Sequence, residues 1–122
     1  MRKNLPDLSA LPKEVEIVDV SARDGLQSLP FPLPTHKRVL WIRALLEAGL
    51  REVEGGAFVS EERVPTMAGT EEVFAALSDL EKERVWALAP NEKGFSRAAK
   101  AGAKKIICLA SATEKHSREN LG

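Results

Sequence analysis

Residues 14–27 read Glu14-Val15-Glu16-Ile17-Val18-Asp19-Val20-Ser21-Ala22-Arg23-Asp24-Gly25-Leu26-Gln27. The first seven residues alternate and are rich in β-branched side chains, which predicts a strand. The strand leads into adjacent opposite charges, Arg23 and Asp24, then a glycine and the amide Gln27. These groups, placed where a strand meets a loop, can hold an anionic, metal-bound substrate, because loops on a rigid scaffold often carry catalytic side chains. A surface ion pair is the alternative interpretation of Arg23 and Asp24.

The rest of the chain repeats a unit of strand and helix. Further strands are expected at residues 50–54, 84–89 and 104–110. The strand at residues 50–54 is expected to stop at Gly55-Gly56. The order becomes βαβαβαβ, and the connections are long enough for right-handed crossovers between parallel strands.

Capping signals set the predicted limits of the intervening helices. The expected N-caps are Thr35, Thr70 and Asn91. Gly49 and Gly102 are expected just after the first and third helices. The apolar stripe of the second helix is predicted to comprise Val73, Phe74, Leu77 and Leu80.

Two architectures fit four such units: an open doubly wound α/β sheet, and the first half of a (β/α)8 TIM barrel. A dinucleotide-binding Rossmann unit is excluded, because Arg23-Asp24-Gly25 stands where G-x-G-x-x-G is required. In a barrel, polar residues at the carboxyl ends of strands form the active site. Such residues occur near all four predicted strand ends: Arg23, Asp24, Glu54, Asn91 and Thr113. We therefore favour the half barrel.

Composition narrows the function classes. The 122 residues include 18 basic and 18 acidic side chains, for a net charge of zero. This balance leaves no excess of positive charge that would favour binding to nucleic acid or to an anionic membrane. There is no apolar stretch long enough for a transmembrane helix and no apolar region behind the basic N-terminus, so we expect a cytoplasmic protein. Residues 1–13 are expected to form an N-terminal arm and residues 14–122 a single domain.

Individual residues outside the motif are given structural interpretations. Cys108, the lone cysteine, excludes an internal disulfide and is expected to be buried in the fourth strand. His36 and His116 are expected in solvated loops. Trp41 and Trp86 are expected in the core rather than as a platform for a cofactor.

Arg23-Asp24-Gly25-Leu26-Gln27 resembles the signature of the pyruvate-carboxyltransferase-like metal-dependent TIM barrels. This superfamily includes 3-hydroxy-3-methylglutaryl-CoA (HMG-CoA) lyase. Leu26 makes the motif resemble that of the lyase branch, because the synthases usually carry Glu at that position. The similarity spans residues 14–122 and continues through Glu47-Ala48-Gly49-Leu50, Val53-Glu54, Phe58-Val59-Ser60, Val64-Pro65-Thr66-Met67, Ala89-Pro90-Asn91-Glu92-Lys93-Gly94-Phe95, and Thr113-Glu114 with Asn120.

The resemblance implies roles for the site residues. Asp24 would be a ligand of a divalent cation, Mg²⁺ or Mn²⁺. Arg23 would bind the substrate and stabilise an enolate, and Glu54 would be an acid/base or supporting carboxylate. Substrate binding would also involve Gln27, Asn91 and Thr113. The implied reaction is the metal-dependent retro-aldol (Claisen-type) cleavage of an acyl-CoA, HMG-CoA, to acetyl-CoA and acetoacetate.

The chain also departs from the family pattern. Gly55-Gly56-Ala57 stands where the lyases carry Thr or Ser after the strand carboxylate. The family's His-x-His metal pair and catalytic cysteine have no counterpart within the 122 residues. We therefore expect a fragment, a truncated frame or one part of a split enzyme, with an incomplete site.

Three functions remain open at this point. They are a lyase of the HMG-CoA type, a related aldolase or acyl-CoA condensing enzyme, and a non-catalytic half-barrel module. The unpaired strand edges of a half barrel also predict that the chain self-associates or pairs with a missing second half.

Overall fold

Four parallel strands form one sheet in the computed structural model, which describes residues 11–120. They are β1 (Val18–Asp19), β2 (Glu52–Ala57), β3 (Val85–Leu88) and β4 (Lys105–Ile107). Their order in space, β1-β2-β3-β4, follows their order in the chain. A doubly wound sheet reverses its strand order at a switch point, whereas a barrel does not. The prediction of four alternating βα units in barrel order is confirmed.

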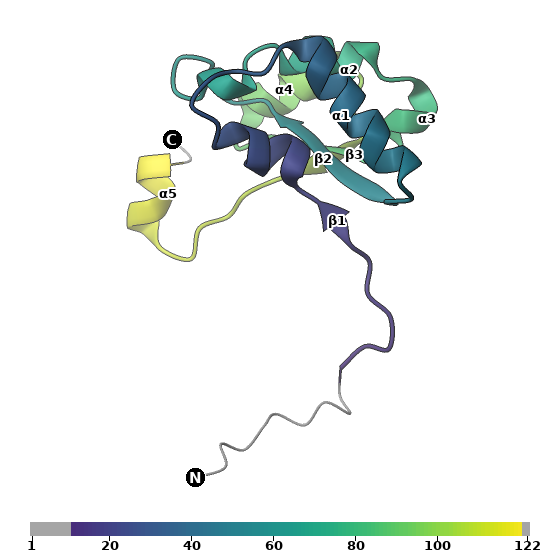
Figure 1. The fold of residues 1–122 in the computed structure, drawn as a ribbon. Helices are drawn as coiled ribbons and strands as arrows, with labels where there is room; N and C mark the ends of the chain where they lie inside the picture. Colours follow the sequence, from purple (N-terminus) through teal and green to yellow (C-terminus); the bar gives the residue numbers. More distant parts are fainter. Residues whose placement is uncertain (1–10, 121–122) are drawn as a thin grey trace.

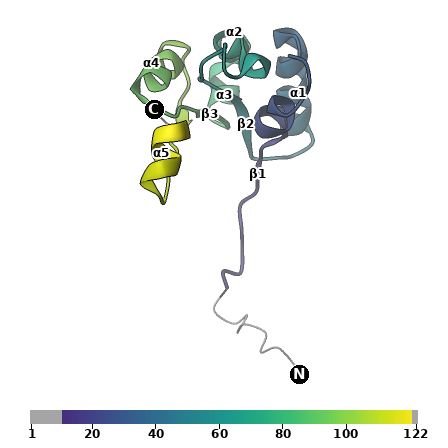
Figure 2. The ribbon, with the colours of Figure 1, turned by 90° about the vertical axis from the view of Figure 1, so that its left-hand side faces the viewer.

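Helices cover one face of the sheet. The main ones are α1 (Thr35–Glu47), α2 (Thr70–Ala76) and α4 (Glu92–Lys100), which lie above the strands in both ribbon views (Figures 1 and 2). Two further α-helices are α3 (Asp79–Lys82) and α5 (Glu114–Asn120). None of the helices in the described part of the chain is long and apolar enough to cross a membrane.

The core lies between this helical layer and the sheet. Its fully buried members include Ile42 of α1, Val53 of β2, Phe74 of α2 and Val85 of β3. Phe58, just after β2, packs against Phe74 with ring centroids 5.4 Å apart. Burial of apolar area of this kind is the main force that holds the helices on the sheet.

The capping predictions are confirmed where the signal is local. Asn91 caps α4, because its Oδ1 accepts a hydrogen bond from the Gly94 amide at 2.9 Å. Gly49 and Gly102 follow α1 and α4 with φ of +99° and +80°, the left-handed conformation that glycine tolerates.

The predictions of Thr35 and Thr70 as N-caps are wrong. Pro34 and Gly69 occupy the two cap positions, and each threonine is the first helical residue. Thr70 is buried, where its hydroxyl donates to the Met67 carbonyl and accepts from Arg38. A tertiary contact therefore uses the hydroxyl that a cap would have used.

Three predictions of burial are also wrong. Leu80 is 82% exposed, because the chain becomes extended at Leu77 and Ser78 starts the separate helix α3. Trp41 is 48% exposed and donates its indole N–H to the Ser21 hydroxyl. Cys108 is exposed because β4 ends one residue before it.

The remaining single-residue predictions are confirmed in part. His36 and His116 are exposed as expected, but they lie in α1 and α5 rather than in loops. Trp86 is half-buried on β3, where its indole N–H donates to Glu52 at 2.6 Å. Of the predicted N-terminal arm, residues 1–10 lie outside the described residues.

Candidate active site

A single turn of π-helix, η2 (Ser21–Gly25), follows β1, contains the first three residues of the predicted motif and replaces the expected loop. Three successive amides, those of Arg23, Asp24 and Gly25, donate to the Val20 carbonyl at 3.2, 2.8 and 3.3 Å. Asp19 fixes the start of the turn, because its Oδ1 accepts from the Ser21 amide at 2.9 Å. Turns of π-helix are often found at functional sites. This one holds Arg23 beside β2.

Arg23 stands at the centre of the site. Its Nε donates to Glu54 Oε2 at 2.6 Å, and its Nη1 donates to Asp24 Oδ1 at 2.9 Å. The side chains of Arg23 and Glu54 are only 17% and 11% exposed, whereas that of Asp24 is 61% exposed. Among the described residues, none accepts a hydrogen bond from Nη2 of Arg23. The guanidinium is therefore fixed by two carboxylates and keeps one nitrogen for a ligand.

Glu54 does not lie at the end of its strand, as predicted, but in the middle of β2. The strand continues through both glycines to Ala57, with a register shift against β3 between Glu54 and Gly56. Such an irregularity redirects side chains and is common next to active sites.

Both strand positions require glycine because neighbouring side chains occupy the space in which a Cβ would lie. A Cβ on Gly55 would lie 2.4 Å from Val85 Cγ1. A Cβ on Gly56 would lie 2.7 Å from Thr70 Cγ2 and 3.0 Å from Arg38 Nη2. Close packing, rather than a strand break, therefore accounts for the pair.

The three other predicted site residues are not joined to this cluster by any hydrogen bond or ion pair within residues 11–120. The backbone carbonyl of Gln27 accepts from the Thr66 hydroxyl at 3.0 Å. The side-chain oxygen of Asn91 is used by the α4 cap. Thr113 is exposed, and its hydroxyl accepts from the His116 amide at 3.4 Å. The structure thus brings together Arg23, Asp24 and Glu54.

Sequence reasoning missed two polar residues, one that supports the η2 turn and one that is buried beside Gly56. The first is Asp19, whose contact with Ser21 two residues later is a local pattern that the sequence displays. The second is Arg38 of α1, which is fully buried and donates to the Ala68 carbonyl at 2.8 Å and to Thr70 at 3.0 Å. Burial lowers the pKa of Arg38 from its ordinary value. No signal in the sequence pointed to it, because its partners lie about 30 residues away.

The cluster does not by itself form a metal site. Within residues 11–120 there is no group of three or more His, Cys, Asp and Glu side chains that could hold a metal ion. Oδ1 of Asp24 already accepts from Arg23. Mg²⁺ requires near-octahedral oxygen ligation, so Asp24 supplies one candidate ligand and not a complete set.

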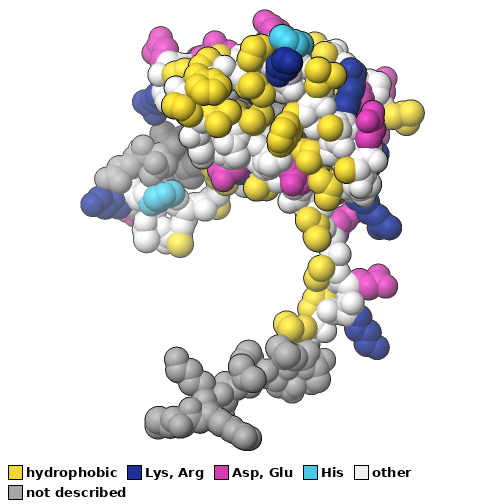
Figure 3. Space-filling model, viewed as in Figure 1, with side chains coloured by type: hydrophobic (Ala, Val, Ile, Leu, Met, Phe, Trp, Pro, Cys, Tyr) yellow, Lys and Arg dark blue, Asp and Glu magenta, His cyan; other side chains and the backbone are white. Residues whose placement is uncertain are grey.

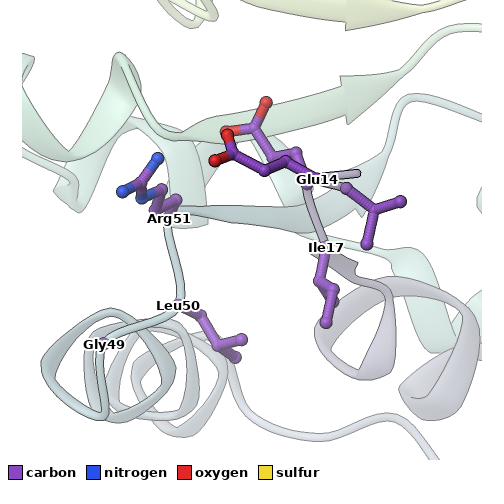
Figure 4. A pocket seen from close by; sticks show the side chains of 7 residues that line it. Glu14, Ile17, Gly49, Leu50 and Arg51 are labelled. Atoms are coloured by element: carbon purple, nitrogen blue, oxygen red, sulfur yellow. The ribbon is translucent and has the colours of Figure 1, made fainter. Parts of the chain in front are cut away.

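Two hollows of the described surface lie outside the cluster. One is formed after β2 and β3 by residues that include Ser60, Arg63, Asn91 and Lys93. The other lies between residues 14–17 and the turn before β2, where Ile17 and Leu50 point into the same space (Figure 4). The first hollow follows the carboxyl ends of strands, which is where barrel enzymes bind substrates.

Comparison with known proteins gives one consistent family. The family model described as HMGL-like matches residues 14–122. The chain is 41% identical over 111 residues to a 3-hydroxy-3-isohexenylglutaryl-CoA/hydroxymethylglutaryl-CoA lyase of Pseudomonas aeruginosa, covering 91% of this chain and 37% of that protein. It is 42% identical over 111 residues to the mitochondrial hydroxymethylglutaryl-CoA lyase of Arabidopsis thaliana, covering 91% of this chain and 24% of that protein.

The solved structures that match this chain indicate the same family. The hydroxymethylglutaryl-CoA lyase of Pseudomonas aeruginosa superposes with a TM-score of 0.78 at 42% identity, over 90% of this chain and 37% of that one. An HMG-CoA lyase of Acinetobacter baumannii, in complex with coenzyme A and 3-methylmalate, gives a TM-score of 0.78 at 34% identity, over 87% and 35%. The chain spans about a third of the length of these structures. Its four βα units match part of a TIM barrel, and the chain belongs to the HMGL-like family.

Proposed function

We propose that this chain provides the N-terminal part of an acyl-CoA lyase active site, one that cleaves HMG-CoA to acetyl-CoA and acetoacetate. The observation that carries the proposal is the Arg23 guanidinium, which is fixed by Glu54 and Asp24 while its Nη2 has no hydrogen-bond acceptor among the described residues. Family membership supports the same reaction class.

The cleavage reaction needs a positively charged side chain that is held in a fixed position. In the retro-aldol step a general base takes the proton of the C3 hydroxyl, the C2–C3 bond breaks, and the electron pair moves onto the thioester carbonyl. The products of this step are acetoacetate and the enolate of acetyl-CoA, which is then protonated at C2. We place Nη2 of Arg23 as a donor to the developing enolate oxygen. Removing a single preorganised donor of this kind costs roughly 10²–10³ in kcat.

Glu54 acts in this proposal as a positioning residue rather than an acid or base. It is 8% exposed, and its Oε2 accepts the Nε–H of Arg23. A carboxylate in that position fixes the plane of the guanidinium, so that no reorganisation is needed when charge develops on the substrate.

Asp24 is proposed to contribute one oxygen to a Mg²⁺ or Mn²⁺ site, because these hard cations prefer carboxylate ligands. A cation bound there would polarise the substrate oxygens. The other ligands would come from outside residues 11–120. Gln27, Asn91 and Thr113 are proposed to contact the acyl-CoA, a ligand class supported by the coenzyme A in the Acinetobacter baumannii structure.

A chimera tests the function. Residues 14–122 replace the corresponding segment of the Pseudomonas aeruginosa lyase, which shares 41% identity with this chain. We expect the chimera to release acetoacetate from HMG-CoA in the presence of Mg²⁺ or Mn²⁺. A folded chimera that releases none would contradict the proposal, whereas condensation of acetyl-CoA with a 2-oxo acid in place of cleavage would favour the condensing-enzyme alternative.

A further inference from the structure

The segment that follows β2 has little regular structure of its own. Residues 59–63 lie in neither helix nor strand, between Phe58 and the short helix η3 (Pro65–Met67). Its turn is closed by the amides of Arg63 and Val64, which donate to the Ser60 carbonyl at 3.2 and 2.9 Å. A segment with so few internal hydrogen bonds opens easily, so its position depends on what holds it from outside.

Residues 59–63 form one wall of the hollow that follows β2 and β3. Ser60 and Arg63 line the hollow from this segment, and Asn91 lines it from the start of α4. The two walls are in close contact at one point, because a Cβ on Gly94 would lie 2.5 Å from the Phe58 carbonyl oxygen. The shape of the hollow therefore depends on how the segment runs relative to α4.

Arg97 of α4 holds the segment against the helical layer. Its Nη1 donates to the Val59 carbonyl at 2.8 Å, and its Nε donates to Glu71 of α2 at 2.5 Å. Its Cζ lies 6.0 Å from the centroid of the Phe58 ring, which is buried against Phe74. The guanidinium is thus fixed by a carboxylate and an aromatic ring on rigid elements, while one of its donors reaches the segment.

A second contact joins the segment to the same group of charges. The helical side of the molecule carries charged side chains of both signs (Figure 3). Glu61 lies 3.8 Å from Nη2 of Arg97 and accepts a hydrogen bond from the Gly69 amide, just before α2, at 3.3 Å. Within residues 11–120, the hydrogen bonds to the Val59 carbonyl and to Glu61 are the two that join residues 59–63 to the helical layer. Arg97 contributes at both places, so its removal should release the segment.

We propose that Arg97 is a positioning residue for the acyl-CoA, because it fixes residues 59–63 as a wall of the hollow. The inference rests on the proposed lyase function, since it takes the hollow as the place where the acyl-CoA binds. Arg97 borders the hollow, but its Nε and Nη1 are already engaged, so it acts through the Val59 backbone and not on the reacting atoms. Binding against a segment that is already ordered costs less, so the contact lowers KM and leaves kcat unaffected.

Steady-state kinetics of the chimera test this role. Arg97→Met keeps an unbranched apolar side chain and removes every donor, so we expect KM for HMG-CoA to rise about tenfold with kcat unchanged. Arg97→Lys keeps one amine, which reaches Glu71 or the Val59 carbonyl but not both, and should give a smaller rise in KM. Circular dichroism shows whether each variant folds.

Arg43→Met is the matched control. Arg43 also joins a carboxylate to a backbone carbonyl, because it donates to Glu81 at 2.7 Å and to the Ala76 carbonyl at 3.0 Å. It does not line the hollow within the described part of the chain, so its loss should leave KM and kcat unchanged. An equal rise in KM for Arg43→Met and Arg97→Met, or an effect of Arg97→Met on kcat alone, would overturn the proposal.

Amide hydrogen exchange of the full chain tests the contact with the segment independently of activity. In Arg97→Met the amides of Arg63 and Val64 should exchange at least about tenfold faster than in the parent, because the segment opens more often. In Arg43→Met they should exchange as in the parent. Unchanged exchange in Arg97→Met, or faster exchange with an unchanged KM, would overturn the proposal. A chimera without activity would instead contradict the lyase function, and with it the role of Arg97 toward acyl-CoA, so the two failures can be told apart.

Discussion

Replacing Gly56 by alanine should destabilise the fold through one crowded contact. The added Cβ would lie 2.7 Å from Thr70 Cγ2 and 3.0 Å from Arg38 Nη2. Neither group can withdraw easily, because both side chains are fully buried and joined by a hydrogen bond of 3.0 Å. Overpacking of this kind costs about 1–3 kcal/mol. In a domain of this size that cost corresponds to a fall in Tm of roughly 4–12 °C.

A second substitution identifies the contact that is responsible. Thr70→Ser removes Cγ2 but keeps the hydroxyl that binds Arg38 and the Met67 carbonyl. Alone it should cost about 1 kcal/mol for the lost methyl group. Combined with Gly56→Ala it leaves room for the new methyl, so the double variant should be more stable than the sum of the single effects by about 1 kcal/mol or more.

Urea denaturation followed by far-ultraviolet circular dichroism measures all three variants. Gly49→Ala is the control, because no atom lies within 4 Å of its added Cβ and only its φ of +99° opposes the change. Its cost of about 1 kcal/mol should be unaffected by Thr70→Ser. A Gly56→Ala variant as stable as the parent, or strict additivity with Thr70→Ser, would refute the packing explanation of the glycine pair.

Three further predictions concern the helices. The hydrogen bond from Arg43 lowers the pKa of Glu81 to about 2 in the folded chain, so its stabilisation is present above pH 4.5 and is lost as the pH falls toward 2. Because both side chains remain partly exposed, we expect about 1 kcal/mol, and Glu81→Gln should flatten the pH dependence of the urea midpoint between pH 2 and 5. Asn91→Ala should cost about 1 kcal/mol through the lost cap, whereas Asn91→Asp should keep the stability and, in the chimera, raise KM where the amide contacts substrate. Phe74→Ala should cost about 3–5 kcal/mol, because the ring is fully buried against Phe58; a loss below 1 kcal/mol in chemical denaturation would contradict the assigned core.

Much of the architecture could be predicted from local patterns. The β-branched runs and the spacing between them indicated parallel βα units, and the structure has them in sequential order. Asn91 and the glycines at 49 and 102 act within one turn of their helices, so short-range chemistry was enough to assign them.

The errors arise where long-range packing decides. Gly55 and Gly56 indicate a strand break locally, but the side chains that fill their space come from residues 38, 70 and 85. The Thr70 hydroxyl is diverted from capping by the distant Arg38. The predicted strand at 14–20 is paired only at Val18 and Asp19, since strand length depends on the neighbour.

The same distinction between local and long-range contacts explains why only part of the site could be predicted. Arg23 and Asp24 are adjacent in the chain, so their pairing follows from the motif. The contact between Arg23 and Glu54 joins residues 31 positions apart and requires both the η2 turn and the irregular register of β2. The roles of Gln27, Asn91 and Thr113 toward a substrate stay predictions.

The most direct measurement of the central claim is the kcat of the chimera carrying Arg23→Lys. Lysine keeps the charge but lacks the planar donors that Glu54 and Asp24 hold in place. We predict a fall in kcat of roughly 10²–10³ for HMG-CoA cleavage, while Arg118→Lys, an exposed control in α5, leaves kcat unchanged. An Arg23→Lys chimera that retains the parent kcat would contradict the assignment of Arg23 as the enolate-binding group.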